Sequence, residues 1–306
     1  MKRPLPSDAL SNPHEDGLTE ALEALTGRRN MLRMLAGASL LPLAACGTVG
    51  SGVDAGSAGG VAGGGSAGGT VGGGAAGGGT AGGGAAAGGT AGGGVASCAT
   101  IPSETAGPYP ADGTNNNGLS SLTATGIVRR DIRSSFGAYA GTAAGVPLTV
   151  TLTLVNINAN CAPLANAAVY LWHCDIDGSY SLYTVANQNY LRGVQETDAN
   201  GQVTFQSIFP AAYSGRWPHI HFEIFSSLAR ATVGGNALKT SQLALPKASC
   251  DLAYATAGYA LSVSNLARSN LSTDNVFSDG VSLQLAAVTG DVTAGFAASL
   301  TVGVAA

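Results

Sequence analysis

The chain has 306 residues, of which only 10% are charged, and its formal net charge is −4 at pH 7. A nucleic acid needs a basic surface that neutralises its phosphates, so this composition excludes nucleic acid as an expected partner. Composition is so uneven along the chain that only the part after residue 97 can form a packed core, and we expect one folded domain there.

An export signal is expected at residues 1–46. Arg28 and Arg29 stand next to each other, and an apolar run follows from Met34 to Ala45. The run is shorter than the roughly 20 residues that cross a bilayer as a helix, so a cleaved signal is favoured over a permanent transmembrane segment. The paired arginines resemble the signal of the pathway that exports folded proteins.

A lipid anchor is expected at the end of this signal. Residues Leu43 to Cys46 resemble a bacterial lipoprotein box, in which the cysteine is acylated and becomes the first mature residue. Several acyl chains on Cys46 would hold the protein durably at a membrane face. The expected location is therefore periplasmic or at the cell surface, with membrane contact only through this anchor. An ordinary cleaved signal with an incidental cysteine is the alternative, and the membrane leaflet stays open.

Residues 47–97 are expected to form a flexible linker. They are almost wholly Gly, Ala, Ser and Thr, include more than half of the 46 glycines, and carry one charge, Asp54. Such a segment cannot bury enough apolar surface to fold. As a Gly-rich coil it reaches on the order of 40 Å, which is enough to separate a domain from a membrane.

The cysteines after the signal are even in number: Cys98, Cys161, Cys174 and Cys250. An even set in an exported protein suits two disulfides, and three pairings are open. The alternative is that they are small buried hydrophobic residues.

Residues 98–306 are expected to form an all-β domain, an antiparallel β-sandwich. Strict alternation from Leu148 to Leu154 places leucines and a valine on one face and threonines on the other, which is typical of a half-buried strand. Turn residues such as Asp198 to Gly201 separate the short apolar runs. No long stretch has a convincing helical period, and many short strands favour two packed sheets. The further expected strands are Ala168–His173, Gln202–Ile208, His219–Phe225, Ser282–Val288 and Ala297–Val304.

The candidate metal site centres on His219 and His221. On a strand these two side chains share one face with Glu223, while the intervening residues face the core. Two imidazoles about 7 Å apart along one face can converge on one metal ion. A structural, non-metal role for the pair is the alternative.

The type of site is narrowed by the residues that accompany this pair. The chain has four histidines, and none follows His221, which disfavours a cupin-type site. A structural zinc site is disfavoured because no close Cys-x-x-Cys pair exists. An iron(II) site of two histidines and Glu223 stays open. Phenolate oxygens of Tyr180 and Tyr213 are the other candidates, and a hard anionic donor suits iron(III).

Several motifs in a fixed order resemble one known family. The run from Ala168 to Tyr180 is followed by Arg192-Gly, by Thr197-Asp and by the segment from Tyr213 to His221. In this order they resemble the intradiol ring-cleavage dioxygenases, the family of protocatechuate 3,4-dioxygenase and catechol 1,2-dioxygenase. The similarity covers most of residues 98–306, from Glu104-Thr-Ala-Gly-Pro-Tyr109 to Thr240-Ser-Gln-Leu243.

The resemblance implies a non-haem iron(III) enzyme that inserts both atoms of O2 into a catechol-type ring to give a muconate-type diacid. Its partners would be a small aromatic diol and O2, with the oligomeric state open. The implied metal ligands are Tyr180, Tyr213, His219 and His221, and Tyr213 would also accept a substrate proton. Arg216 matches the active-site arginine of the family, and Gln242 matches a polar residue that closes the pocket. The sequence departs from the family at Tyr170, where an acidic residue is usual. A second hypothesis is an inactive extracytoplasmic binding module on the same fold, which would bind an aromatic ligand without turnover.

Overall fold

The computed structural model describes residues 98–115 and 118–306. The export signal expected at residues 1–46, with Cys46, and the linker expected at residues 47–97 lie outside this part of the chain. Within it, no helix is both long enough and apolar enough to cross a membrane. The elements in chain order are β1 (Pro147–Asn156), the 3-10 helix η1 (Ile157–Ala159), β2 (Ala162–Pro163), β3 (Ala168–Trp172), β4 (Arg192–Glu196), β5 (Gln202–Ile208), β6 (His219–Phe225), α2 (Leu228–Thr232), β7 (Lys239–Ala244), α3 (Lys247–Tyr254), α4 (Ala260–Ala267), β8 (Ala287–Asp291) and β9 (Gly295–Val304).

The strands form two sheets, which confirms the all-β core. One sheet has the order β2-β1-β9-β8, with β5 also paired to β1, and the other has the order β4-β3-β6-β7. The alternating apolar residues of β1 and β5 on one sheet and of β3 and β6 on the other belong to a single buried cluster. Each sheet therefore buries one face against the other, because a strand points alternate side chains to opposite faces.

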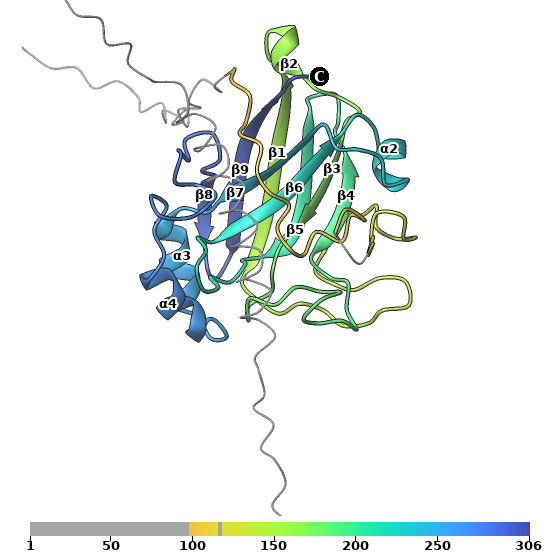
Figure 1. Ribbon diagram of the computed structural model, residues 1–306. Coiled ribbons are helices and arrows are strands. Elements are labelled where there is room, and N and C mark those ends of the chain that lie inside the picture. The colour runs from red at the N-terminus through yellow and green to blue at the C-terminus, as the bar shows by residue number, and fades with distance from the viewer. Residues whose placement is uncertain (1–97, 116–117) are drawn as a thin grey trace, which may run out of the picture. The chain divides into compact units, whose positions relative to one another are not determined.

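The pairing is not wholly antiparallel as expected from the sequence. Strand β9 pairs in parallel with β1, with Leu148 opposite Phe296 and Asn156 opposite Val304. The two strands lie side by side in the middle of their sheet (Figure 1). Alternation within a strand reports which face is buried and not the direction of its neighbour, so the sequence carried no signal for this pair.

Most expected strands are confirmed, and β5 and β6 have the predicted bounds. The strand expected at Ser282–Val288 is wrong, because β8 begins only at Ala287. Upstream of it the chain makes a turn in which the amides of Gln284 and Leu285 both donate to the carbonyl of Val281, at 2.8 Å each. The short helices were not expected; α2 lies beside β3 and β4, and α3 lies beside β8 (Figure 1).

The expectation of two disulfides is wrong. Cys98 pairs with Cys161, with Cα atoms 5.6 Å apart, whereas Cys174 and Cys250 are free and buried. The Cys174 thiol donates weakly to the carbonyl of Ala211 at 3.7 Å, and Cys250 packs in the apolar core. These two cysteines behave as the small buried hydrophobic residues of the alternative interpretation.

Candidate functional site

The site lies on the face of the four-stranded sheet that points away from the core between the sheets. His221 on β6 is in register with Trp172 on β3 and with Gln242 on β7, and Trp172 is in register with Arg192 on β4. Residues that are directly opposite in a ladder share a face, so these four side chains form one row across the sheet. In this row His221 lies between the ring of Trp172 and the side-chain amide of Gln242.

Strand β6 shows the alternation expected from its sequence. Ile220, Phe222 and Ile224 belong to the core between the sheets. His219 and His221 face the other way and are each only 2% exposed. They are buried because segments before β1 and between β3 and β4 cover this face, and the aromatic residues of these segments pack with Tyr170 and Trp172 in a second apolar cluster.

Tyr180 is delivered by a tight turn that follows β3. The Asp175 carboxylate accepts from the amides of Asp177 and Ser179, at 3.0 and 2.9 Å, and from the Tyr190 hydroxyl at 2.8 Å. These bonds reach amides two and four residues after Asp175 and fix the turn just before Tyr180, as is usual for an Asp that binds its own following backbone. The Tyr180 ring itself is 2% exposed.

Tyr213 lies in the loop between β5 and β6, directly against the Tyr180 turn. Gly178 has φ +80°, and a Cβ placed on it would lie 3.0 Å from the Tyr213 Cβ. Only glycine adopts this backbone conformation readily and allows this approach. The two loops are therefore packed so tightly that the position of one tyrosine depends on the turn that carries the other.

The four predicted ligands come together. The Tyr213 Oη lies 3.0 Å from the His219 Nε2 and 3.4 Å from the Tyr180 Oη. The Nε2 atoms of His219 and His221 are 3.1 Å apart. Two oxygen and two nitrogen donors from three segments of the chain thus meet at one point on the sheet.

The orientation of His219 leaves a lone pair at this point. Its Nδ1 lies 2.5 Å from the Trp217 carbonyl oxygen, which can only accept, so Nδ1 carries the proton and Nε2 is free to accept or to bind a metal. Burial, followed by the Arg216 charge, lowers the pKa of His219 well below its usual value. Burial and then His219 do the same to the pKa of His221. Both imidazoles are neutral at neutral pH, the form that binds metals.

The two phenols are held in their protonated form while no cation is bound. Burial, and after it the neighbouring Tyr213, raises the pKa of Tyr180 well above the usual value. Burial raises the pKa of Tyr213 to about 12, with the Arg216 guanidinium acting in the opposite direction. Burial disfavours the charged form of a phenol, so both tyrosines can lose their protons only when a highly charged cation lies nearby and stabilises the two phenolates.

The donor set fits a trivalent iron ion. Among residues 98–115 and 118–306 no group of three or more His, Cys, Asp or Glu side chains could hold a metal. The cluster around His219 has only two residues of these types, and tyrosine oxygens supply the rest. Phenolate is a hard anionic ligand and imidazole suits iron, so the residues present match iron(III) better than zinc or copper(I).

Arg216 and Gln242 lie beside the donors, as the resemblance implied. The Arg216 Nη1 is 3.4 Å from the His219 Nε2, and its Nη2 donates to the Gln242 Oε1 at 2.8 Å. The Gln242 amide nitrogen donates to the Thr105 carbonyl at 2.9 Å. Burial alone would lower the pKa of Arg216, but Tyr213 and then Asp274 outweigh it and the pKa is raised.

Asp274 is a site residue that was not predicted from the sequence. Its carboxylate lies 3.0 Å from the Arg216 Nε, and both residues are buried. It stands in an irregular loop 58 residues beyond Arg216. A single aspartate in a loop carries no motif, so no signal in the sequence pointed to it.

Arg192 is a second buried cation near the site. It is 1% exposed, and its donors bind the carbonyls of Tyr109, Pro110 and Ser181 at 2.8 to 3.0 Å. Its Nε also donates to the Ser181 hydroxyl at 3.1 Å, and its Nη1 donates to the Tyr170 hydroxyl at 3.0 Å. Arg192 thereby joins the segment before β1 to the residue next to Tyr180. Its motif was visible in the sequence, but its partners were not.

Tyr170 has a clear place in this network. Its hydroxyl donates to the Pro110 carbonyl at 2.7 Å, and its ring stacks on Trp172 with centroids 4.8 Å apart. Trp172 in turn stacks on His221, with centroids 5.0 Å apart and planes 7° from parallel. The residue that departs from the family pattern therefore supports the row that carries His221.

Glu223 points to a different set of groups from the histidines. Thr240 donates to its carboxylate at 3.2 Å. Burial, and then the charge of Asp112, raises the pKa of Glu223 to about 8. The iron(II) alternative would need this carboxylate beside both imidazoles, and its contacts are instead with Asp112 and Thr240.

His173 has both ring nitrogens in use. Its Nε2 is 2.6 Å from the Ser207 hydroxyl, and its Nδ1 is 2.7 Å from the Cys174 carbonyl. Burial lowers its pKa to about 4. His173 is thus a hydrogen-bonded histidine of the interior, next to the site in sequence but not among its donors.

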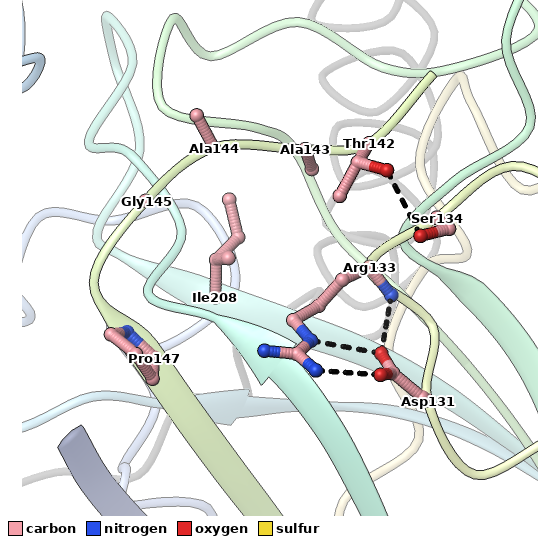
Figure 2. A pocket seen from close by; sticks show the side chains of 9 residues that line it. All are labelled: Asp131, Arg133, Ser134, Thr142, Ala143, Ala144, Gly145, Pro147 and Ile208. Carbon is pink, nitrogen blue, oxygen red and sulfur yellow. Dashed lines mark hydrogen bonds and ion pairs between the residues drawn. The ribbon is translucent and has the colours of Figure 1, made fainter. Parts of the chain in front are cut away.

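A surface pocket of about 310 Å³ lies elsewhere, beside Ile208 and the segment that leads into β1. Figure 2 shows the Arg133 guanidinium beside the Asp131 carboxylate in its lining, with nitrogen–oxygen distances of 2.9 and 2.6 Å. Ser134 and Thr142 also bind each other, at 3.0 Å. The polar groups of this pocket are thus already paired, and none of them is a candidate ligand.

Comparisons with known proteins point in the same direction as the motifs. A family model described as dioxygenase matches residues 132–234, which include all four candidate ligands and Arg216. A curated relative, hydroxyquinol 1,2-dioxygenase of Corynebacterium glutamicum, is 29% identical over 115 residues, which are 32% of this chain and 38% of that protein. The chain therefore matches well under half the length of that relative.

One of the aligned solved structures supports a shared fold. An intradiol ring-cleavage dioxygenase from Tetranychus urticae aligns with a TM-score of 0.53 and 25% identity, over 68% of this chain and 94% of that chain. A 3-chlorocatechol 1,2-dioxygenase from Rhodococcus opacus aligns with a TM-score of 0.41 and 21% identity, over 67% and 73% of the two chains. The family model and the Tetranychus urticae structure confirm the resemblance that the motifs indicated.

Proposed function

Because this chain resembles the intradiol ring-cleavage dioxygenases in its motifs and in its fold, we propose that it is an iron(III)-dependent dioxygenase that opens catechol-type rings between the two hydroxyl-bearing carbons. The product would be a muconate-type diacid that contains both atoms of O2. The observation that carries the proposal is the meeting of four donors, three of them on buried residues and one on the partly buried Tyr213. The Tyr213 Oη lies 3.0 Å from the His219 Nε2, and the two imidazole Nε2 atoms are 3.1 Å apart.

The proposed ligands are Tyr180, Tyr213, His219 and His221. Bound iron(III) would supply the redox chemistry that makes an aromatic diol reactive towards O2. Tyr213 is the proposed internal base: when a substrate oxygen takes its place, its Oη accepts a substrate proton. Its high pKa in this buried site, about 12, makes the released oxygen a strong acceptor.

Arg216 has an electrostatic part in the proposal. Its Nη1 is directed at the donor cluster, 3.4 Å from the His219 Nε2. A guanidinium remains protonated and can stabilise negative charge that develops on the ring oxygens. Gln242 holds this guanidinium by its amide oxygen and holds the segment of Thr105 by its amide nitrogen. We propose that both residues orient the substrate without binding the metal.

The test is turnover of a catechol by the iron-loaded protein. Steady O2 uptake with a ring-opened diacid as product supports the proposal. A stable coloured complex without uptake contradicts it and favours the binding module, which would keep the fold and lose the chemistry.

The ligand set is tested by metal content. Tyr180→Phe removes one hydroxyl and keeps the ring that packs at the site, so iron affinity should fall by more than about 100-fold. Glu223→Ala is the matched control, on the same face of β6 as the histidines, and should retain iron. The opposite outcome would favour the iron(II) site.

We also propose that the protein is exported and tethered to a membrane by Cys46 through the linker of residues 47–97. The basis is the twin-arginine pattern and the lipoprotein box in the sequence. Metabolic labelling with a radioactive fatty acid tests it, because Cys46→Ser should abolish the label while leaving the folded domain intact.

A further inference from the structure

The starting point is the set of donors that surround the Asp274 carboxylate. One oxygen accepts from the Arg216 Nε at 3.0 Å and from the Trp217 amide at 2.7 Å. The other accepts from the amides of Val276 and Phe277 at 2.8 and 3.2 Å and lies 3.4 Å from the Arg216 Nη2. Asp274 is 4% exposed and Arg216 is 7% exposed, so this ion pair is largely removed from water.

The geometry leaves one nitrogen of the guanidinium for a ligand. Nε faces Asp274, and Nη2 donates to the Gln242 Oε1 at 2.8 Å. Nη1 is the nitrogen nearest the donor cluster, 3.4 Å from the His219 Nε2. Because a guanidinium is a rigid planar fork, fixing two nitrogens fixes the direction of the third. Asp274 therefore determines where Arg216 presents its hydrogen-bond donors.

The same contact sets the charge of this side of the site. An unpaired buried guanidinium would attract any additional anionic group on the substrate. Here the Asp274 carboxylate lies in contact with the guanidinium and cancels most of that attraction. A carboxylate on the substrate would also be repelled by Asp274. Water screens such interactions weakly when the charges are buried.

We propose that Asp274 is a positioning and charge-compensating residue, which aims Arg216 at the bound diol and makes the site select catechols with uncharged ring substituents over catechols that carry a carboxylate. This inference rests on the proposed function and names the substrate class of that same site. Asp274 acts through Arg216 and touches neither the metal donors nor the substrate.

The test compares two ligands of nearly the same shape, 3,4-dihydroxybenzamide and 3,4-dihydroxybenzoate. Their affinities are measured by calorimetry on the iron-loaded full-length protein without O2, so that binding is read and not turnover. The natural protein should bind the amide more tightly, because the Arg216–Asp274 pair is nearly neutral and does not repay the desolvation of the benzoate carboxylate. Tighter binding of the benzoate by the natural protein would overturn the proposal with no variant needed.

The variants separate charge from structure. Asp274→Asn removes the charge but also places an amide nitrogen against backbone donors, so it should weaken both ligands. Only the loss of charge changes the ratio of the two affinities, which should shift in favour of the benzoate by roughly tenfold. Asp274→Glu should keep the ratio. Asp251→Asn is the matched control, because Asp251 is an exposed acid paired with Lys247 and its loss should leave the ratio unchanged.

The outcomes distinguish the two proposals. Catechol turnover together with a ratio that Asp274→Asn does not move overturns this inference alone. Absence of diol binding and of O2 uptake in an iron-loaded protein overturns the proposed function instead. If Asp274→Asn does not fold, the ratio in the natural protein and in Asp274→Glu still decides the inference.

Discussion

Gly178→Ala should disturb the site through a single methyl group. Gly178 has φ +80°, and an added Cβ would lie 3.0 Å from the Tyr213 Cβ and 3.9 Å from its Cα. Two effects are expected from this one change. The left-handed backbone conformation costs an alanine about 1 to 2 kcal/mol. The methyl group also presses on a candidate ligand.

The second effect can be estimated from the distance. Non-bonded carbon atoms are most favourable at about 3.5 to 4.0 Å, so Tyr213 or the turn must move by roughly 0.5 Å. A misplacement of about 1 Å in an active site costs on the order of 100-fold in rate, so half of that movement should cost about tenfold. The expected loss is therefore about tenfold in kcat per bound iron, in addition to the loss of stability.

Gly234→Ala is the matched control. Gly234 has φ +68°, and an added Cβ would meet nothing within 4 Å. Both variants should lose a similar 1 to 2 kcal/mol in the free energy of unfolding, which chemical denaturation measures. Only Gly178→Ala should lower O2 uptake per bound iron. Equal uptake per iron in the two variants would refute the argument that the turn of Gly178 positions Tyr213.

Three further predictions follow from charge and burial. Both phenols are protonated at neutral pH because burial raises the pKa of Tyr180 and of Tyr213. Loading with iron(III) should therefore release about two protons per ion, which an indicator dye in weak buffer measures. Release of no protons would contradict phenolate ligation. The pKa of His173 is lowered from 6.5 to about 4, so its contribution to stability is present above pH 6.5 and is lost as the pH falls towards 4. The free energy of unfolding should therefore decrease less in His173→Gln when the pH falls from 6.5 towards 4, by about 3 kcal/mol. An unchanged pH profile of stability would show that burial of this ring is not the cause. Arg192→Met should lower the free energy of unfolding by at least about 3 kcal/mol, because three buried carbonyls lose their donors. Arg192→Lys should recover only part of this stability. Full recovery with lysine would contradict a role for the planar five-donor group.

The sequence was informative wherever a property repeats over a few neighbouring residues. Alternation from Gln202 to Ile208 and from His219 to Phe225 gave strands whose bounds agree with the structure. The same alternation placed His219 and His221 on one face, away from Ile220 and Phe222. Tyr180 and Tyr213 were found because they stand in short motifs in a fixed order. The reason is that side-chain direction in a strand depends only on the local backbone.

The sequence was less informative for short helices and turns. Helix α3 spans only Lys247–Tyr254, and its buried face consists of Ser249, Cys250, Ala253 and Tyr254. Three of these four residues are small, so the segment shows little helical contrast in hydrophobicity. Its helical form comes from packing against the rest of the domain, which propensity alone does not report.

Only the tertiary structure decided which distant segments meet. The parallel pairing of β1 with β9, the bond between Cys98 and Cys161, and the contact of Asp274 with Arg216 join residues that are 58 or more positions apart. Sequence by itself determined most of the long strands, the face of the histidine pair and the donor types available to a metal, but not the strands β4 and β7. Packing alone brings Asp274 to Arg216 and the hydrogen-bond partners to Arg192. Electrostatic and hydrogen-bond contacts depend on distance in space and leave no period along the chain.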